Sequence, residues 1–399
     1  MRPAMKSRFV LVNQSPSRSL VQLAEQLASR GHEVFLLAGA MPHDTAPFKV
    51  NVVRMPRYRS GSMIGRVFSW SSFALRSALW LTTTPANAAV IACTNPPVMP
   101  FLAVLASRIR HFAVVARVLD VYPDVFKATR FADCTLLRQV ITACNRWTYA
   151  RCSWVETLGP HMAGSIAAIA PTTSVIVAPE SIDDTGLTRD ESKLESRRLL
   201  NLPPEACVVL VSGNYGMTHD LRPLADATTR IRNEPIRFVI CTTNRTALHK
   251  LFGNSENVTV LTSLPTADYH RLLNASDVAV ISLRPGAETA SFPSRALSYM
   301  AAGLPIVAAM RTPGDLSDLL VLHNCGVVVA PQDVSGLVAA IRALAADDAG
   351  RLACSTRARE AARAFEARNC IPSSASRLEA LASQTFTGCD ERPPEPAGK

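Results

Sequence analysis

The sequence contains no hydrophobic run of the roughly 20 residues that a bilayer-spanning helix needs. Its ten cysteines form no C-x-x-C pair, which disfavours a zinc or thiol–disulfide centre. Several stand inside apolar runs, as Cys93 does, and indicate small core residues in a reducing compartment. The basic first residues are not followed by the apolar stretch of a signal peptide. We therefore expect a cytoplasmic protein, soluble or peripheral on the inner face of the plasma membrane, with no metal site.

Acidic residues are also in deficit, with 32 Asp and Glu against 42 Lys and Arg and a formal charge of +10. Such an excess favours an anionic partner: a nucleotide, a nucleic acid or an anionic membrane surface. Because no nucleic-acid-binding module is recognisable, nucleic acid is the weakest of the three. No G-x-G-x-x-G follows the first expected strand, which disfavours an NAD enzyme.

What the sequence does contain is a long alternation of short apolar runs and helical stretches. Strand, helix and strand follow one another between Phe9 and Leu37, which is the spacing of a βαβ unit with parallel strands. The pattern continues to Val177, gives way to a polar stretch at 180–200, and restarts at Val208. It predicts the α/β class, with two tandem Rossmann-like domains and a ligand site in the interdomain cleft.

The same pattern sets the expected boundaries. We expect a first Rossmann-like domain at 1–182, a linker containing a helix at 183–200, and a second domain with C-terminal helices at 201–386. The Pro-rich, charged end of the chain, 387–399, predicts a disordered tail. The expected strands are 9–12, 34–37, 89–92, 113–119, 154–158 and 174–177 in the first domain, and 208–211, 238–240, 258–261, 278–281, 306–308 and 327–329 in the second.

Three segments carry candidate chemistry. In 291–309, Pro293 suits the first turn of a helix that starts near Ser294 and Arg295, and a helix start beside an arginine can bind an anion. In 209–221, glycines after a strand would let a phosphate approach the backbone and a helix is expected to begin near Thr218. Asp120 directly follows a buried strand, where a catalytic or acceptor-binding carboxylate belongs. An ordinary amphipathic helix, a plain turn and a helix-capping Asp fit the same three patterns.

Six motifs follow one another along the chain: RGHEV after the first helix, TNPP at 94–97, LDVYPD at 119–124, SGNYGMTHDL, ASDVAVISLRPG and PSRALSYMAAGLPIV. In order and spacing they together resemble the retaining, GT-B fold glycosyltransferases of family 4. The similarity covers roughly residues 8–370 and is greatest to the group that assembles O-antigen, capsule and colanic acid.

The resemblance implies that the second domain binds a nucleotide-diphosphate sugar and the first a lipid-linked saccharide acceptor. It implies no cofactor and no metal for the diphosphate, whose charge helix N-termini and arginines would neutralise. The implied catalytic residues are Asp120 and Arg295. The implied donor-binding residues are Gly213, Asn214, His219, Arg284, Glu288, Pro293, Ser294 and Ser298.

The sequence also departs from this family. Ser298 stands where many members have a Glu that holds the ribose, Ala290 stands where another Glu touches the donor sugar, and Glu288 is out of register. These departures keep open a degraded homologue that binds a nucleotide sugar or a partner enzyme without turnover. A third hypothesis is an enzyme that acts on a nucleotide sugar without transfer, such as a non-hydrolysing epimerase.

Residues 54–81 carry five arginines interleaved with large apolar side chains, among them Phe68, Trp70, Phe73 and Trp80. A basic helix with aromatic anchors can lie in a membrane interface. A helix whose apolar face packs on its own sheet is the alternative.

Overall fold

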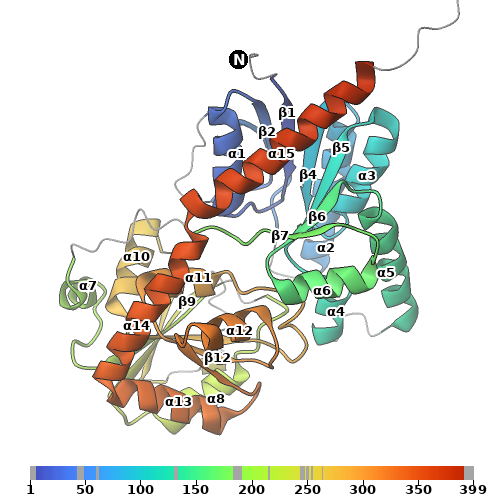
Figure 1. Ribbon diagram of the computed structural model, residues 1–399. Helices are drawn as coiled ribbons and strands as arrows, with labels where there is room; N and C mark the ends of the chain where they lie inside the picture. Colours follow the sequence, from blue (N-terminus) through green and yellow to red (C-terminus); the bar gives the residue numbers. More distant parts are fainter. Residues whose placement is uncertain are drawn as a thin grey trace, which may run out of the picture.

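The computed structural model describes residues 6–42, 49–59, 63–129, 134–182, 191–213, 216–242, 248, 251–252, 255–262 and 264–390. They form two α/β domains, each built on a parallel sheet that is covered by helices (Figure 1). The prediction of two tandem Rossmann-like domains is therefore confirmed.

The first sheet has the order β3-β2-β1-β4-β5-β6-β7. Its central strands are buried on both faces, as parallel strands between two helix layers are. Phe9 and Leu11 face helices α1 (Arg18–Ser29) and α15 (Ala367–Asp390), whereas Val10 and Val12 face α2 (Met63–Leu81) and α3 (Met99–Arg110). The strands are β1 (Arg8–Val12), β2 (Glu33–Ala38), β3 (Asn51–Arg54), β4 (Ala88–Cys93), β5 (Ala113–Val118), β6 (Trp154–Thr157) and β7 (Val175–Val177). The edge strand β3 is not in the sequence-based prediction, because it is only four residues long and half-exposed.

The second sheet has the order β10-β9-β8-β11-β12-β13, and all six expected strands are present. Strand order reverses between β8 and β11, which opens a crevice at their carboxyl ends. The strands are β8 (Cys207–Ser212), β9 (Ile236–Thr242), β10 (Val258–Thr262), β11 (Val278–Ser282), β12 (Ile306–Ala309) and β13 (Gly326–Val329). The helices are α8 (Arg222–Arg230), α10 (Thr266–Ala275), α11 (Arg295–Ala302), α12 (Asp315–Leu322), α13 (Val334–Ala346) and α14 (Asp348–Ala362), followed by the 3-10 turn η1 (Arg363–Phe365).

Helix α15 corrects the expected end of the second domain. It crosses back and packs on α1 and the first sheet (Figure 1) through a buried stripe of Ile371, Ala375, Leu378 and Ala382. In the sequence, the spacing of these residues indicates an apolar helix face, but it does not indicate which of the two sheets that face packs on. The helix also runs to Asp390, so the tail expected at 387–399 begins inside it. Residues 391–399 lie outside the described residues.

The linker contains the expected helix, α7 (Lys193–Leu199), whereas 183–190 lie outside the described residues. Helix α7 packs on α10, and both Lys193 and Arg197 pair with Asp277 of the second domain. The remaining helices, α4 (Asp124–Thr129), α5 (Thr135–Tyr149) and α6 (Pro160–Ile169), belong to the first domain. Of the helices in the described parts of the chain, none has the length and hydropathy to cross a bilayer.

The segment 54–81 fits both interpretations in part. Phe73 is fully buried in the core of the first domain, and Trp80 packs on Phe35 at 5.4 Å between ring centroids. Phe68 and Leu79 of the same helix are instead 65% and 61% exposed. One face of α2 therefore packs on its own sheet while another remains uncovered.

The packing of α15 is tested by Leu378→Ala. We expect this change to lower the free energy of unfolding of the first domain by about 2–5 kcal/mol, because it leaves a cavity against α1. All four tryptophans lie in the first domain, so urea denaturation followed by tryptophan fluorescence reports on it. Leu352→Ala, at a 68% exposed position on α14, is the matched control. Equal effects of the two changes would contradict the packing.

Candidate functional site

A cavity of about 280 Å³ lies at the carboxyl ends of β8 and β11, beside the start of α11. We call it the donor cavity. It brings together five of the residues singled out from the sequence, and it adds three serines and an aromatic side chain that the sequence did not reveal. The predicted members are Gly213, His219, Pro293, Ser294 and Arg295, and the additional polar and aromatic ones are Ser212, Ser282, Ser291 and Phe292.

Gly213 directly follows β8 and has a φ of +146°, a region that favours glycine. Asn214 lies outside the described residues. The helix expected near Thr218 begins instead at Arg222. Residues before it are held to the loop after β11, because Arg284 N–H donates to Thr218 O at 2.8 Å and His219 forms an isolated bridge with Leu283.

The other wall of the donor cavity is the start of α11. Ser294 is the N-cap residue and its side chain makes no capping hydrogen bond. Pro293 precedes the cap, so the expectation that it occupies the first turn is wrong. The helix ends as expected at Gly303, which has a φ of +75°.

Two tyrosines that the sequence analysis missed hold Arg295 at the cavity. The guanidinium carbon of Arg295 lies 4.8 Å from the ring centroid of Tyr269, a cation–π arrangement. The Tyr269 hydroxyl is 2.9 Å from Ser212 Oγ, which is also 2.9 Å from the buried Tyr299 hydroxyl. This network ties Arg295 to the end of β8 and therefore restricts where its charge can lie. Tyr299 stands in the PSRALSYM motif, but nothing in the sequence pairs it with Ser212.

Asp120 brings the first domain to the donor cavity. It follows β5 and forms an antiparallel bridge with Ser291, and the neighbouring Val121 N–H donates to Ala290 O at 2.7 Å. Burial raises the pKa of the Asp120 carboxyl, and a hydrogen bond with Ser291 partly offsets this. Thr94 of the TNPP motif supports the turn, since its Oγ1 accepts from Leu119 N–H at 3.0 Å.

The remaining predicted residues lie elsewhere. Glu288 is buried and accepts a hydrogen bond from Gly286 N–H at 2.8 Å, so it closes its own loop. Ser298 lies half-buried one turn into α11. Neither lines the donor cavity, and their donor-binding roles stay predictions. Arg284 lines a second cavity.

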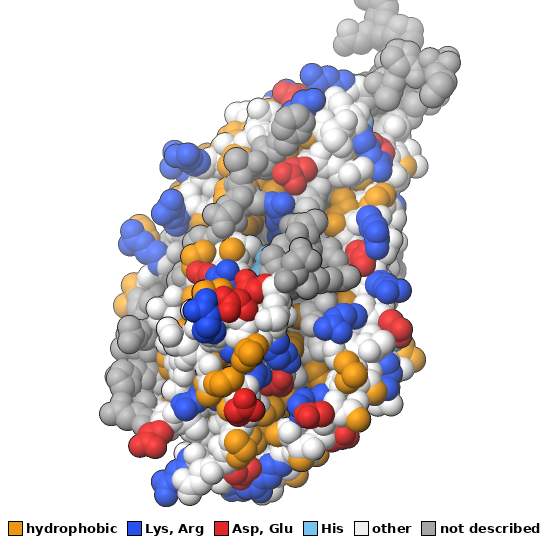
Figure 2. Space-filling model, turned by 90° about the vertical axis from the view of Figure 1, so that its left-hand side faces the viewer, with side chains coloured by type: hydrophobic (Ala, Val, Ile, Leu, Met, Phe, Trp, Pro, Cys, Tyr) orange, Lys and Arg blue, Asp and Glu red, His pale blue; other side chains and the backbone are white. Residues whose placement is uncertain are grey.

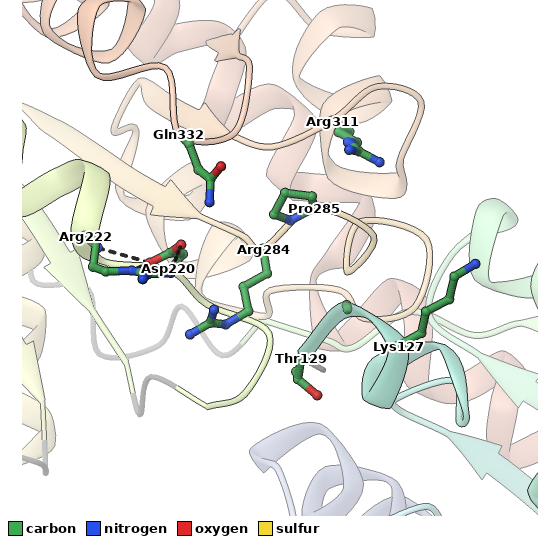
Figure 3. Close-up of a pocket in the computed structure, with 9 residues that line it drawn as sticks. Lys127, Thr129, Asp220, Arg222, Arg284, Pro285, Arg311 and Gln332 are labelled. Carbon is green, nitrogen blue, oxygen red and sulfur yellow. Dashed lines mark hydrogen bonds and ion pairs between the residues drawn. The ribbon is translucent and has the colours of Figure 1, made fainter. Parts of the chain in front are cut away.

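The second cavity, of about 540 Å³, lies between the two domains (Figure 3). Arg284, Arg311 and Gln332 follow β11, β12 and β13, and Lys127 comes from α4 of the first domain. Of these residues, only Arg284 was predicted from the sequence. The position of Arg311 and Gln332 just after strands is the signal that could have found those two, whereas Lys127 lies inside a helix and carries no such signal. The complete lining is Lys127, Ala128, Thr129, Asp220, Arg222, Arg284, Pro285, Arg311 and Gln332.

Sequence similarity to a known protein family is found in the second domain. Residues 206–347 match the family model described as glycosyl transferases group 1. The match is confined to this stretch of the second domain. A colanic acid relative matches as well: WcaI of Escherichia coli K12, described as a colanic acid biosynthesis glycosyl transferase, is 28% identical over 152 residues. That alignment spans 37% of this chain and 37% of the relative's length.

Solved structures are similar in fold to nearly the whole chain, and not only to the second domain. Sucrose-phosphate synthase from Thermosynechococcus elongatus has a TM-score of 0.72 at 16% identity, over 96% of this chain and 100% of that one. HepE of Anabaena in complex with UDP-glucose has a TM-score of 0.69 at 15% identity, with the same two coverages. The two facing Rossmann-like domains form a GT-B fold, as the sequence resemblance implied. At these identities the likeness concerns the fold alone.

Among the described residues, no group of three or more His, Cys, Asp or Glu side chains is arranged to hold a metal ion. Positive charge at the donor cavity comes from Arg295 and the start of α11. His219 adds none at neutral pH, because burial, and next the charge of Arg284, lower the pKa of its imidazole to about 4. It therefore offers a neutral ring to a ligand.

The state of His219 can be measured by NMR. We expect its imidazole to titrate near pH 4 and to stay neutral from pH 5.5 to 8. Arg284→Gln removes a repulsive charge from the imidazolium form, so it should raise the pKa, while burial keeps it below the ordinary value of about 6.5. Arg232→Gln, at an exposed position that lines neither cavity, should leave the titration unchanged. An unmodified protein in which His219 titrates near 6.5 would refute this account.

Proposed function

We propose that this protein is a glycosyltransferase that moves a sugar from a nucleoside-diphosphate sugar to a saccharide acceptor. One observation carries the proposal: Gly213, His219 and Arg295 meet in one cavity at the strand-order reversal of the domain that matches the glycosyl transferases group 1 model. Ligands of open parallel sheets bind at that position. UDP and UDP-glucose are bound in the HepE structures that share this fold.

The donor cavity offers what a leaving diphosphate needs. Arg295 supplies a forked cation, the start of α11 supplies the positive end of a helix dipole, and Gly213 leaves room beside the backbone. In the transfer, the acceptor hydroxyl oxygen bonds to the anomeric carbon while the bond from that carbon to the diphosphate oxygen breaks. We propose that transfer retains the anomeric configuration and that the hydroxyl proton passes to the leaving diphosphate, with no metal ion or cofactor. Catalysis then consists of positioning and of stabilising the departing charge.

The acceptor would approach from the first domain, whose Asp120 touches Ser291 at the rim of the donor cavity. Its carboxylate is suitably placed to orient an acceptor hydroxyl. We propose a lipid-linked saccharide of surface polysaccharide biosynthesis as the acceptor, a proposal that the colanic acid relative supports.

A nucleotide-sugar-binding protein without turnover is the second candidate. Ala290 carries no carboxylate, and it is fully buried with its carbonyl accepting a hydrogen bond from Val121 N–H. Glu288 is occupied with its own loop. These observations leave the donor sugar without an evident acidic partner among the residues that line the donor cavity.

Arg295→Gln, compared with the unmodified protein in binding and turnover assays, distinguishes a glycosyltransferase from a nucleotide-sugar-binding protein without turnover. We expect it to weaken nucleoside-diphosphate binding at least about tenfold in calorimetry, because a charge-assisted bidentate contact is lost. It should also lower release of nucleoside diphosphate from a panel of donors incubated with membrane extract. Arg232→Gln serves as the control. Binding without any release, in the unmodified protein, would favour the second candidate; no binding at all would end the proposal.

We further propose that the first domain docks on an anionic membrane. Helices α2, α3 and α5 pack side by side and contain no Asp or Glu. Their arginines, and exposed apolar side chains among which Ile64 is 84%, Phe68 65% and Ile109 68% exposed, share this surface. On the face shown in Figure 2, by contrast, basic and acidic side chains are interspersed. Apolar insertion together with attraction to acidic lipids is the physical basis of interfacial binding.

Vesicle flotation tests this docking. The protein should float with vesicles of phosphatidylglycerol and phosphatidylcholine, less with phosphatidylcholine alone, and less again at high salt. The double change Ile64→Glu and Phe68→Glu should weaken binding by about tenfold or more, since apolar area is lost and negative charge is added. Leu352→Glu on α14 is the control, being exposed in the second domain. Indifference to lipid charge would argue against this surface.

A further inference from the structure

The interdomain cavity of about 540 Å³ (Figure 3) has an unusual charge balance. We call it the basic pocket. It is lined by four cationic side chains and one acid, Asp220, which is buried and held by Arg222 at 3.1 Å. Burial alone would raise the pKa of Asp220, but hydrogen bonds and charge from Arg222 hold it below its usual value. Asp220 and Arg222 therefore neutralise one another.

The other three cations remain in excess. Within the described parts of the chain, no carboxylate lies within 4.0 Å of the charged nitrogens of Lys127, Arg284 or Arg311. The charge of Arg284 also contributes to the lowered pKa of the His219 imidazole, which shows that this charge acts on a neighbouring side chain. Three like charges around one cavity repel each other unless an anion enters it.

The basic pocket is separate from the donor cavity but adjoins it. Ser282 and His219 line the donor cavity, whereas Arg284 and Asp220, two residues and one residue further along the chain, line the basic pocket. The bond from Arg284 N–H to Thr218 O holds these two loops together between the cavities. One elongated ligand could therefore have its anionic end in the basic pocket and a hydroxyl at the donor cavity.

Both domains build this pocket. Lys127, Ala128 and Thr129 come from α4, whereas Arg284 and Pro285 follow β11 of the second domain. In Figure 3, Lys127 on α4 and Arg284 on the loop after β11 extend from the two domains toward opposite sides of the opening. The loop of Gly286 comes close to Ala128, since a Cβ on Gly286 would lie 3.7 Å from that of Ala128. An anion bound here would contact the domain expected to hold the acceptor as well as the domain expected to hold the donor.

We propose that the basic pocket is a second anion site, which holds the diphosphate group of a lipid-linked acceptor while the nucleotide sugar occupies the donor cavity. This inference rests on the proposed function. Arginine forks suit phosphate oxygens, and a volume of about 540 Å³ accommodates more than one phosphate group. The surplus of three positive charges matches a diphosphate better than a single carboxylate.

Calorimetric titration with inorganic pyrophosphate tests the site without knowledge of the donor. The unmodified protein should show two classes of site. Arg295→Gln should weaken one of them about tenfold, and the double change Lys127→Gln and Arg311→Gln should weaken the other about tenfold. Arg232→Gln, also an exposed arginine of the second domain, should change neither. A single class of site that ignores the double change would overturn the inference.

Two further titrations distinguish a failure of this inference from a failure of the proposed function. Farnesyl diphosphate, titrated into the Arg295→Gln protein, should bind at least as tightly as pyrophosphate; weaker binding would overturn a lipid-linked source of the anion. Nucleoside diphosphates should displace pyrophosphate only from the site that depends on Arg295. If no nucleoside diphosphate displaces pyrophosphate from the Arg295-dependent site, the proposed function fails. If only the site that depends on Lys127 and Arg311 is absent, this inference alone is refuted.

Discussion

A short backbone contact between the domains brings the candidate residues of the first domain to those of the second. Val121 N–H donates to Ala290 O at 2.7 Å, and Asp120 bridges Ser291 beside it. The first partner of each pair follows β5 and the second lies between β11 and α11, so the carboxyl edges of the two sheets meet at this point. Asp120 is thereby brought to the rim of the donor cavity, and α4, which begins four residues later, is brought to the basic pocket.

A second contact between the domains involves Asp315 of α12. The Asp315 carboxylate accepts hydrogen bonds from the N–H groups of His161 and Met162 at 2.8 and 3.1 Å. A carboxylate of α12 therefore caps the N-terminus of α6 in the other domain, where a helix dipole favours negative charge. Gly159 makes this approach possible, because a Cβ there would lie 2.3 Å from the Asp315 carboxyl carbon.

The sequence predicted the strands and most helices well, because apolar runs of parallel sheets are continuous and the helices between them are amphipathic. The family resemblance also assigned Gly213, His219 and Arg295 to one site, and these three residues line one cavity. The sequence missed what depends on long-range packing: that α15 returns to the first sheet, that Tyr269 and Tyr299 hold Arg295, and that Glu288 turns into its own loop. Local residue patterns do not predict these contacts. Some partners are far apart in the chain, and others are one of several polar groups that could form the same hydrogen bond.

Domain movement would change the basic pocket, whose lining comes from both domains, and would move Asp120 away from the rim of the donor cavity, whose lining belongs to the second domain. The chain crosses between the domains twice, and the crossings are joined where Ile182 N–H donates to Phe365 O at 2.7 Å. Close by, Glu180 lies 3.5 Å from Arg117, which pairs with Glu156 at 2.9 Å inside the first domain. A buried pair of this kind is costly to break, so the start of the first crossing is firmly attached. Any opening should therefore pivot near these joined crossings, and it would separate Asp120 from Ser291 and Lys127 from Arg284 in the same motion.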